Sequence, residues 1–152
     1  METLKRLMGS GDRIALLVAP FLVVGIVLNV GDPALFSVGG PPPWLLWLSI
    51  GVLAVGVAIW AWSVVLILAN VPRGRLITGG PYRWMTHPLY TAVGLLVLPW
   101  LGFVLDTWLG LALGVVVYVG TRLFGPREEA ELARSFGSAW RDYRRSVRLG
   151  WL

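Results

Sequence analysis

The sequence predicts an all-α fold: a polytopic membrane helical bundle of four transmembrane helices with a C-terminal amphipathic interfacial helix. Three observations predict it. Of the 152 residues, 57% are hydrophobic and only 14% are charged, whereas about a quarter of the residues of a soluble domain are charged. The mean hydropathy is +0.74, and the apolar residues gather in four runs. We therefore expect one membrane domain over 1–152, and we exclude a cytosolic globule, a disordered chain and a disulfide-stapled module.

Four apolar stretches define the expected spans, the fourth of them interrupted near its end by Arg122. They cover 14–30, 44–69, 89–105 and 108–124. At about 1.5 Å per residue, a stretch of seventeen residues reaches roughly 26 Å. That length just meets a hydrocarbon core of roughly 30 Å, and the second stretch exceeds it, so the second helix is expected to tilt or protrude.

The placement of basic residues predicts the topology. Lys5, Arg6 and Arg13 precede the first span, and the other arginines lie between the second and third spans or from the end of the fourth onward. The loops 31–43 and 106–107 contain none. The positive-inside rule then places both termini and the middle loop in the cytoplasm. A signal peptide would also begin with basic residues, but no small-residue cleavage site follows the first stretch, so a span is favoured.

The third and fourth spans are expected to form a tight antiparallel hairpin, because only 106–107 joins them. Glycines along both spans provide small faces for close helix contact: Gly94, Gly102, Gly110, Gly114 and Gly120. Tryptophans near the outer ends of the spans suit the membrane interface: Trp44, Trp47, Trp100 and Trp108.

The tail is expected to form a separate helix. Gly125-Pro126 predicts a break, and a new helix over 126–148 would begin with glutamates in its first turn. Its apolar residues recur at steps of three or four with arginines between them, which is typical of an interfacial helix: Leu132, Phe136, Trp140, Tyr143 and Val147. Gly137 marks the point at which this helix bends or divides.

Two cytoplasmic segments, 74–90 and 126–148, contain the candidate site. His87 and Tyr90 lie one helical turn apart where the third span begins. Antiparallel pairing of the last two spans would bring them opposite Glu128-Glu129, in a groove covered by the tail.

Each of these motifs also has a purely structural interpretation. Thr86-His87-Pro88 suits the start of a helix, and two glutamates complement a helix dipole wherever a helix begins. Arg122 could anchor the end of a span, and the tail arginines could bind lipid headgroups without specificity. Both motifs occur at the same membrane face, at opposite ends of one hairpin, and this coincidence favours a site.

The two segments resemble a known superfamily. The motifs occur in this order: Gly80-Pro81-Tyr82-Arg83-Trp84, then His87-Pro88 and Tyr90, and then, after a hairpin, Glu128-Glu129-x-x-Leu-x-x-x-Phe-Gly. They are similar to those of the isoprenylcysteine carboxyl methyltransferases and phospholipid methyltransferases. The resemblance covers 76–147. It departs from the family pattern at Thr86, where an arginine is usual, and after Val147, where a proline is usual.

The resemblance implies an integral membrane enzyme that uses S-adenosyl-L-methionine. It implies that the cofactor is held by the residues at the family positions: Leu76, Ile77, Tyr82, His87, Pro88, Leu89, Tyr90 and Glu128. The chemistry of these residues is suitable, because a carboxylate suits an ammonium or ribose and aromatic rings suit a cation or a base. The family also tends to place an arginine facing the acceptor's charged head, for which Arg122 is the candidate.

The expected function is methyl transfer to a lipid or lipid-like acceptor at the membrane. The acceptor is either a prenylated cysteine carboxylate, which needs no base, or a phospholipid amine, whose proton Glu129 or His87 would remove. Two alternatives stay open: an NADPH-dependent membrane reductase of the sterol-reductase type, and a non-enzymatic lipid-binding subunit. The absence of cysteine and the single histidine argue against a metal site. In a chain this apolar, the basic charge indicates membrane lipids as partners, and not nucleic acid.

Overall fold

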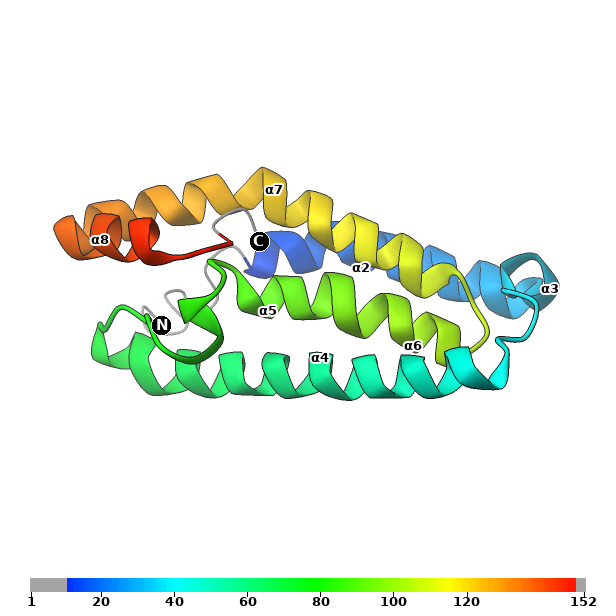
Figure 1. Cartoon of the computed structure of the whole chain (residues 1–152). Helices are drawn as coiled ribbons and strands as arrows, with labels where there is room; N and C mark the ends of the chain where they lie inside the picture. The colour runs from blue at the N-terminus through cyan, green and yellow to red at the C-terminus, as the bar shows by residue number, and fades with distance from the viewer. Residues whose placement is uncertain (1–10, 150–152) are drawn as a thin grey trace.

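The computed structural model describes residues 11–149, which form a bundle of four roughly parallel helical segments (Figure 1). Lys5 and Arg6, which entered the topology prediction, lie outside the described residues. Each expected apolar stretch overlaps one of these segments, and at most one of its residues lies outside. The segments are α2 (Gly11–Gly31), α4 (Pro43–Asn70), an apolar helix over Pro88–Val104 and α7 (Leu109–Phe136).

Three of the described helices are long and apolar enough to cross a membrane. They are Arg13–Gly31, Pro43–Arg73 and Leu109–Phe136. The remaining segment, Pro88–Val104, is a shorter apolar helix, and at about 1.5 Å per residue it reaches only roughly 26 Å. The chain is therefore a multi-pass helical membrane protein, and the predicted count of four spans is not confirmed.

The shorter segment is continuous but irregular. It consists of α5 (Pro88–Thr91), a π-helical stretch η3 (Ala92–Val97) and α6 (Leu98–Val104). The backbone N–H of Leu98 donates to the carbonyl of Val93, five residues earlier. Pro99 follows and has no N–H to donate, so the wider turn lies where the regular helical ladder is interrupted.

The predicted hairpin is confirmed, and glycines bring its two helices into backbone contact. A Cβ atom at Gly114 would overlap the carbonyl oxygen of Gly94, and one at Gly110 would overlap that of Leu98. Gly120 serves a different interface, because it faces Leu17 of α2. Small residues therefore set the distance between the helices that hold the candidate site.

Helix α4 has small residues inside and large residues outside. Its buried residues are Ser49, Gly56 and Ser63, spaced seven apart, so they lie on one face of the helix. The two hydroxyls donate to backbone carbonyls within α4, while Trp44 and Trp47 are largely exposed. The bulky surface of α4 therefore faces the surroundings of the bundle.

The end of the bundle away from the candidate site is closed by hydrogen bonds. The short helix α3 (Pro33–Phe36) lies in the connection from α2 to α4. The carboxylate of Asp106 accepts from the Ser37 hydroxyl at 2.7 Å and from the Gly40 N–H at 2.9 Å, and these bonds lower the pKa of Asp106. Trp108 stacks on Phe36 with ring centroids 4.7 Å apart.

The predicted helix break at Gly125-Pro126 is wrong. Helix α7 continues through Pro126 as far as Phe136. A proline in a helix also clashes with the Cβ of the preceding residue, and Gly125 has no Cβ, so this clash is absent, although the backbone N–H at position 126 is still lost. The predicted helix over 126–148 is therefore two pieces: the end of α7 and α8 (Ser138–Ser146).

The tail divides at Gly137, where φ is +56°, a conformation that favours glycine. Helix α8 folds back against the end of α7 (Figure 1). The apolar residues of the two pieces form one cluster. Trp140, Tyr143 and Val147 are buried in it, with Leu132 and Phe136 packed against them. The apolar periodicity and the division at Gly137 were therefore predicted correctly, whereas the start of a new helix at Pro126 was not.

Candidate functional site

The middle loop folds onto the end of α4 and so positions Tyr82. The loop contains two short 3₁₀ helices, η1 (Val71–Arg73) and η2 (Gly80–Arg83). Gly80 has φ +60°, and a Cβ atom there would lie 2.9 Å from Leu66 Cδ1. Only glycine combines that conformation with such close contact to α4. The Gly79-Gly80-Pro81 turn therefore places Tyr82 at the end of the bundle that the charges predict to be cytoplasmic.

The C-terminal segment covers the middle loop. Tyr143 of α8 donates its hydroxyl to the backbone carbonyl of Tyr82 at 2.8 Å. The Leu149 N–H donates to the Trp84 carbonyl at 2.9 Å, and Leu149 forms a parallel bridge with Met85. The tail thus packs over the middle loop through α8 and Leu149.

The central contact of the site joins the two motifs. His87 Nε2 lies 3.3 Å from Glu129 Oε1, and the two side chains are 10% and 27% exposed. A Cβ atom on Gly125 would lie 3.3 Å from His87 Nε2, so the missing side chain gives the imidazole room against α7. The start of the third helical segment and the acidic pair on α7 are therefore neighbours.

Arg144 is a second partner of Glu129, which sequence reasoning missed. Its Nε donates to Glu129 Oε2 at 3.3 Å. The carboxylate thus lies between a histidine from α5 and an arginine from α8. The sequence contained no signal for this contact, because Arg144 is one of several tail arginines and the contact exists only where α8 folds back.

Tyr82 and Tyr143 lie in an environment that favours their neutral form. Burial raises the pKa of Tyr82, and the negative charge of Glu128 acts in the same direction. Burial also raises the pKa of Tyr143 to about 12. The Tyr143 hydroxyl therefore keeps the proton with which it bonds the Tyr82 carbonyl at physiological pH.

The other predicted cofactor residues are divided between two places. Leu76 packs with Tyr82 against the buried cluster of α8, and Pro88 is among the largest fully buried side chains of the described chain. Ile77 and Leu89 are half-buried. The Tyr90 ring lies 6.1 Å from that of His87, measured between centroids.

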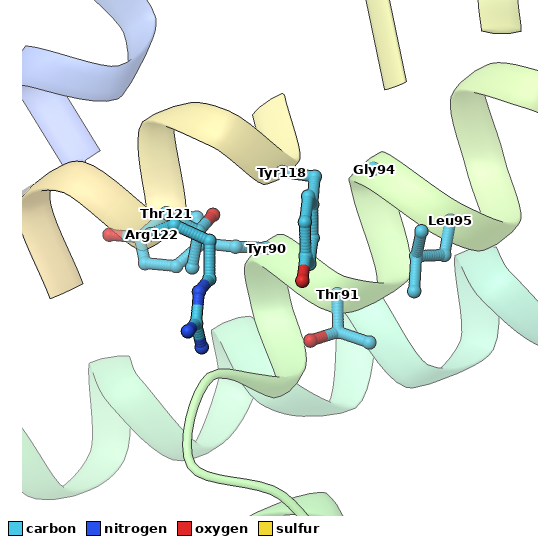
Figure 2. Close-up of a pocket in the computed structure, with 7 residues that line it drawn as sticks. All are labelled: Tyr90, Thr91, Gly94, Leu95, Tyr118, Thr121 and Arg122. Atoms are coloured by element: carbon cyan, nitrogen blue, oxygen red, sulfur yellow. The ribbon is translucent and has the colours of Figure 1, made fainter. Parts of the chain in front are cut away.

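Tyr90 also lines a pocket between the third helical segment and α7, where Arg122 lies. Figure 2 shows Tyr118 and Arg122 extending from α7 in the same direction, with Thr91 and Leu95 on the facing segment. The pocket is lined by Tyr90, Thr91, Gly94, Leu95, Tyr118, Thr121 and Arg122. It combines an apolar wall with one guanidinium. Arg122 therefore lies with Tyr90 in the groove between the two helices. In the sequence, Tyr90 is close to His87 and Arg122 is close to Glu129.

Thr86 differs from the other polar residues of the site. It is 5% exposed, and within residues 11–149 its hydroxyl oxygen has no hydrogen-bond partner. The adjacent His87 is the N-cap residue of α5, with no side-chain cap bond, so the structural interpretation of Thr86 as a helix cap is not supported.

The described part of the chain offers nitrogen and oxygen ligands, but no group of three or more His, Cys, Asp or Glu side chains that could hold a metal ion. What the site does offer is a pair of adjacent carboxylates, an imidazole, three tyrosines and a buried hydroxyl. Groups of this kind bind a ligand that has both charged and aromatic parts.

The fold and the candidate site define a class of protein: an all-helical, multi-pass membrane protein with a polar site at one end of a helical hairpin. The family model of isoprenylcysteine carboxyl methyltransferases matches residues 45–134, which is more than half of the chain. The chain therefore belongs to the isoprenylcysteine carboxyl methyltransferase (ICMT) family, and membership implies a methyltransferase. Neither a curated protein nor a solved structure matches the chain.

Proposed function

We propose that this protein is an S-adenosyl-L-methionine-dependent methyltransferase that acts on a lipid-like acceptor at the membrane surface. The observation that carries the proposal is the 3.3 Å contact between His87 and Glu129. It joins the two sequence motifs of the family across the hairpin, and both residues lie within the matched region.

The residues around this contact have the chemistry that the cofactor needs. Tyr82, His87, Tyr90 and Glu128 would hold it, with Leu76, Ile77, Pro88 and Leu89 shaping the apolar part of the site. A carboxylate suits the ammonium or the ribose hydroxyls, and the tyrosine rings suit a sulfonium or a purine. The cofactor, when bound, supplies an electrophilic methyl group.

Glu129 is proposed to position His87. The carboxylate accepts bonds and cannot donate them when ionised, so the His87 Nε2 in contact with it carries the hydrogen. This arrangement fixes the ring and leaves Nδ1 as the acceptor nitrogen of the neutral imidazole. His87 would then be the proton acceptor if the methyl acceptor is an amine, and a carboxylate acceptor would need no base. Most of the catalysis is expected from positioning and from exclusion of water.

The pocket containing Arg122 is proposed to receive the acceptor. Its apolar wall faces the groove between two membrane helices, and the guanidinium provides a charge at its edge. The free volume of the pocket is about 10 Å³, so the anionic head of an acceptor would meet the guanidinium while its apolar chain lies outside, against lipid. Tritium transferred from labelled cofactor into membrane lipids identifies the acceptor: a methyl ester releases methanol in alkali, whereas an N-methyl group does not.

The test of the proposed function is binding of S-adenosylhomocysteine to the full chain in detergent, measured by calorimetry. We expect micromolar binding by the native protein and loss of binding in Glu128→Ala and His87→Ala, with thermal unfolding showing that both variants remain folded. Binding of NADP(H) in its place would favour the reductase, and binding of neither would favour a non-enzymatic subunit. Unaltered affinity in both variants would show that the site is assigned to the wrong residues.

A further inference from the structure

Resting on the proposed function, we propose that Thr86 is a binding residue of the same site, whose hydroxyl donates a hydrogen bond to an acceptor atom of the bound cofactor. The inference starts from one anomaly. Only 5% of the surface of Thr86 is exposed, yet its hydroxyl has no hydrogen-bond partner among the described residues.

An unpartnered buried hydroxyl is uncommon in folded proteins. Most buried side-chain polar groups have a hydrogen-bond partner, and one without a partner loses its hydration with no compensation. The other fully buried hydroxyls of the described chain follow the rule: Ser49 and Ser63 both donate to backbone carbonyls of α4. Thr86 is the exception, and it directly precedes His87.

The burial of Thr86 results from the folding of the chain around the site. Its neighbour Met85 is bridged by Leu149, and the Trp84 carbonyl accepts from the Leu149 N–H at 2.9 Å. The C-terminal segment thus covers this stretch from outside. On the other side, His87 lies against Gly125 of α7 and contacts Glu129. Thr86 is therefore flanked in the chain by a residue that touches the C-terminal cover and by a residue of the polar centre.

A ligand in the site would supply the missing acceptor. The proposed cofactor has a carboxylate, ribose oxygens and purine nitrogens, all of which accept from a hydroxyl. The ligand-free protein then keeps an unmet bond that binding completes. This has a consequence that a structural role would not have: removing the hydroxyl weakens binding without weakening the ligand-free fold.

The experiment compares Thr86→Val, which keeps the shape and removes the hydroxyl, with Thr86→Ser, which keeps the hydroxyl. We measure the dissociation constant of S-adenosylhomocysteine and the melting temperature of the ligand-free full chain in detergent. Thr86→Val should bind about tenfold more weakly, and should melt at the same temperature or higher. Thr86→Ser should bind within about twofold of the native protein. Ser63→Ala, which removes a buried hydroxyl that has a partner, is the control and should leave the affinity unchanged.

Native affinity in Thr86→Val would overturn the proposal, as would an equal loss of affinity in Thr86→Val and Thr86→Ser, because shape would then matter and not the hydroxyl. If Thr86→Val does not fold, Thr86→Ser and Thr86→Ala decide the question, since they differ only in the hydroxyl. Failure of the native protein to bind S-adenosylhomocysteine would instead contradict the proposed function, so the two failures are distinguishable.

Discussion

Gly125 is the single residue on which the His87–Glu129 contact depends most directly. It gives the imidazole room against α7, with a distance of 3.3 Å from an added Cβ to His87 Nε2. It also spares Pro126 a clash with a preceding Cβ. The missing side chain therefore leaves room for the histidine against α7.

Gly125→Ala should weaken binding of S-adenosylhomocysteine several-fold, because the added methyl group must displace the imidazole from its position beside Glu129. Alanine is the better helix former by about 1 kcal/mol, but it also restores the clash with Pro126. The measurement is calorimetry on the full chain in detergent, with thermal unfolding alongside.

Gly51→Ala is the matched control, since Gly51 also lies within a helix and no atom is within 4 Å of an added Cβ. It should bind the ligand as the native chain does. Equal affinities in the two variants would mean that the position of His87 does not depend on Gly125.

The residues of the site could be predicted to different degrees. His87 and Glu129 were identifiable because each lies in a compact motif at an end of the same hairpin. Arg144 was not identifiable, because its contact with Glu129 depends on where α8 folds back. That position is set by the left-handed backbone at Gly137, which a periodicity of apolar residues does not reveal.

At the scale of the elements, the hairpin formed by Pro88–Val104 and α7 holds the two halves of the candidate site together. Its helices touch at glycines, with Gly94 against Gly114 and Gly102 against Gly110. The helix ends were predictable within a few residues where hydropathy changes abruptly, as at the ends of α4. They were not predictable at Gly125-Pro126, because both residue types usually end helices, whereas α7 continues through them as α2 continues through Pro20.

Gly110→Ala and Gly114→Ala should each destabilise the folded protein by about 3 kcal/mol, since a methyl group would overlap a backbone carbonyl of the facing helix and neither backbone can move cheaply. The separated helices should also bind S-adenosylhomocysteine poorly. Thermal unfolding in detergent checks the first expectation and calorimetry the second.

Gly31→Ala is the control for the hairpin variants, because Gly31 has no atom within 4 Å of an added Cβ and should melt like the native protein. If Gly110→Ala and Gly114→Ala melt with the control, the close contact of the two helices does not contribute to stability.

At the scale of the whole molecule, the two ends of the bundle differ in chemistry. One end contains the site and the arginines of the middle loop and tail, whereas the other is closed by Asp106, Ser37 and Gly40 without a basic side chain. The prediction that the basic end faces the cytoplasm follows from this asymmetry and from the positive-inside rule.

The orientation can be tested cleanly because the chain has no cysteine. Thr78 and Leu35 are exposed at opposite ends of the bundle. In intact expressing cells, a membrane-impermeant maleimide should label Leu35→Cys and leave Thr78→Cys unlabelled until the membrane is permeabilised. The reverse pattern would place the site outside the cytoplasm, and labelling of both residues in intact cells would contradict a uniform orientation.

The inward row of Ser49, Gly56 and Ser63 on α4 reverses the usual arrangement of a folded protein. In a water-soluble bundle, large side chains interlock in the interior and exclude solvent. Here many large side chains project outward, and hydrocarbon tails must fill the gaps between them, since the buried positions of this helix hold small residues. The bilayer is in this sense the outermost packed layer of the fold, and any medium that replaces it becomes a structural component of the protein.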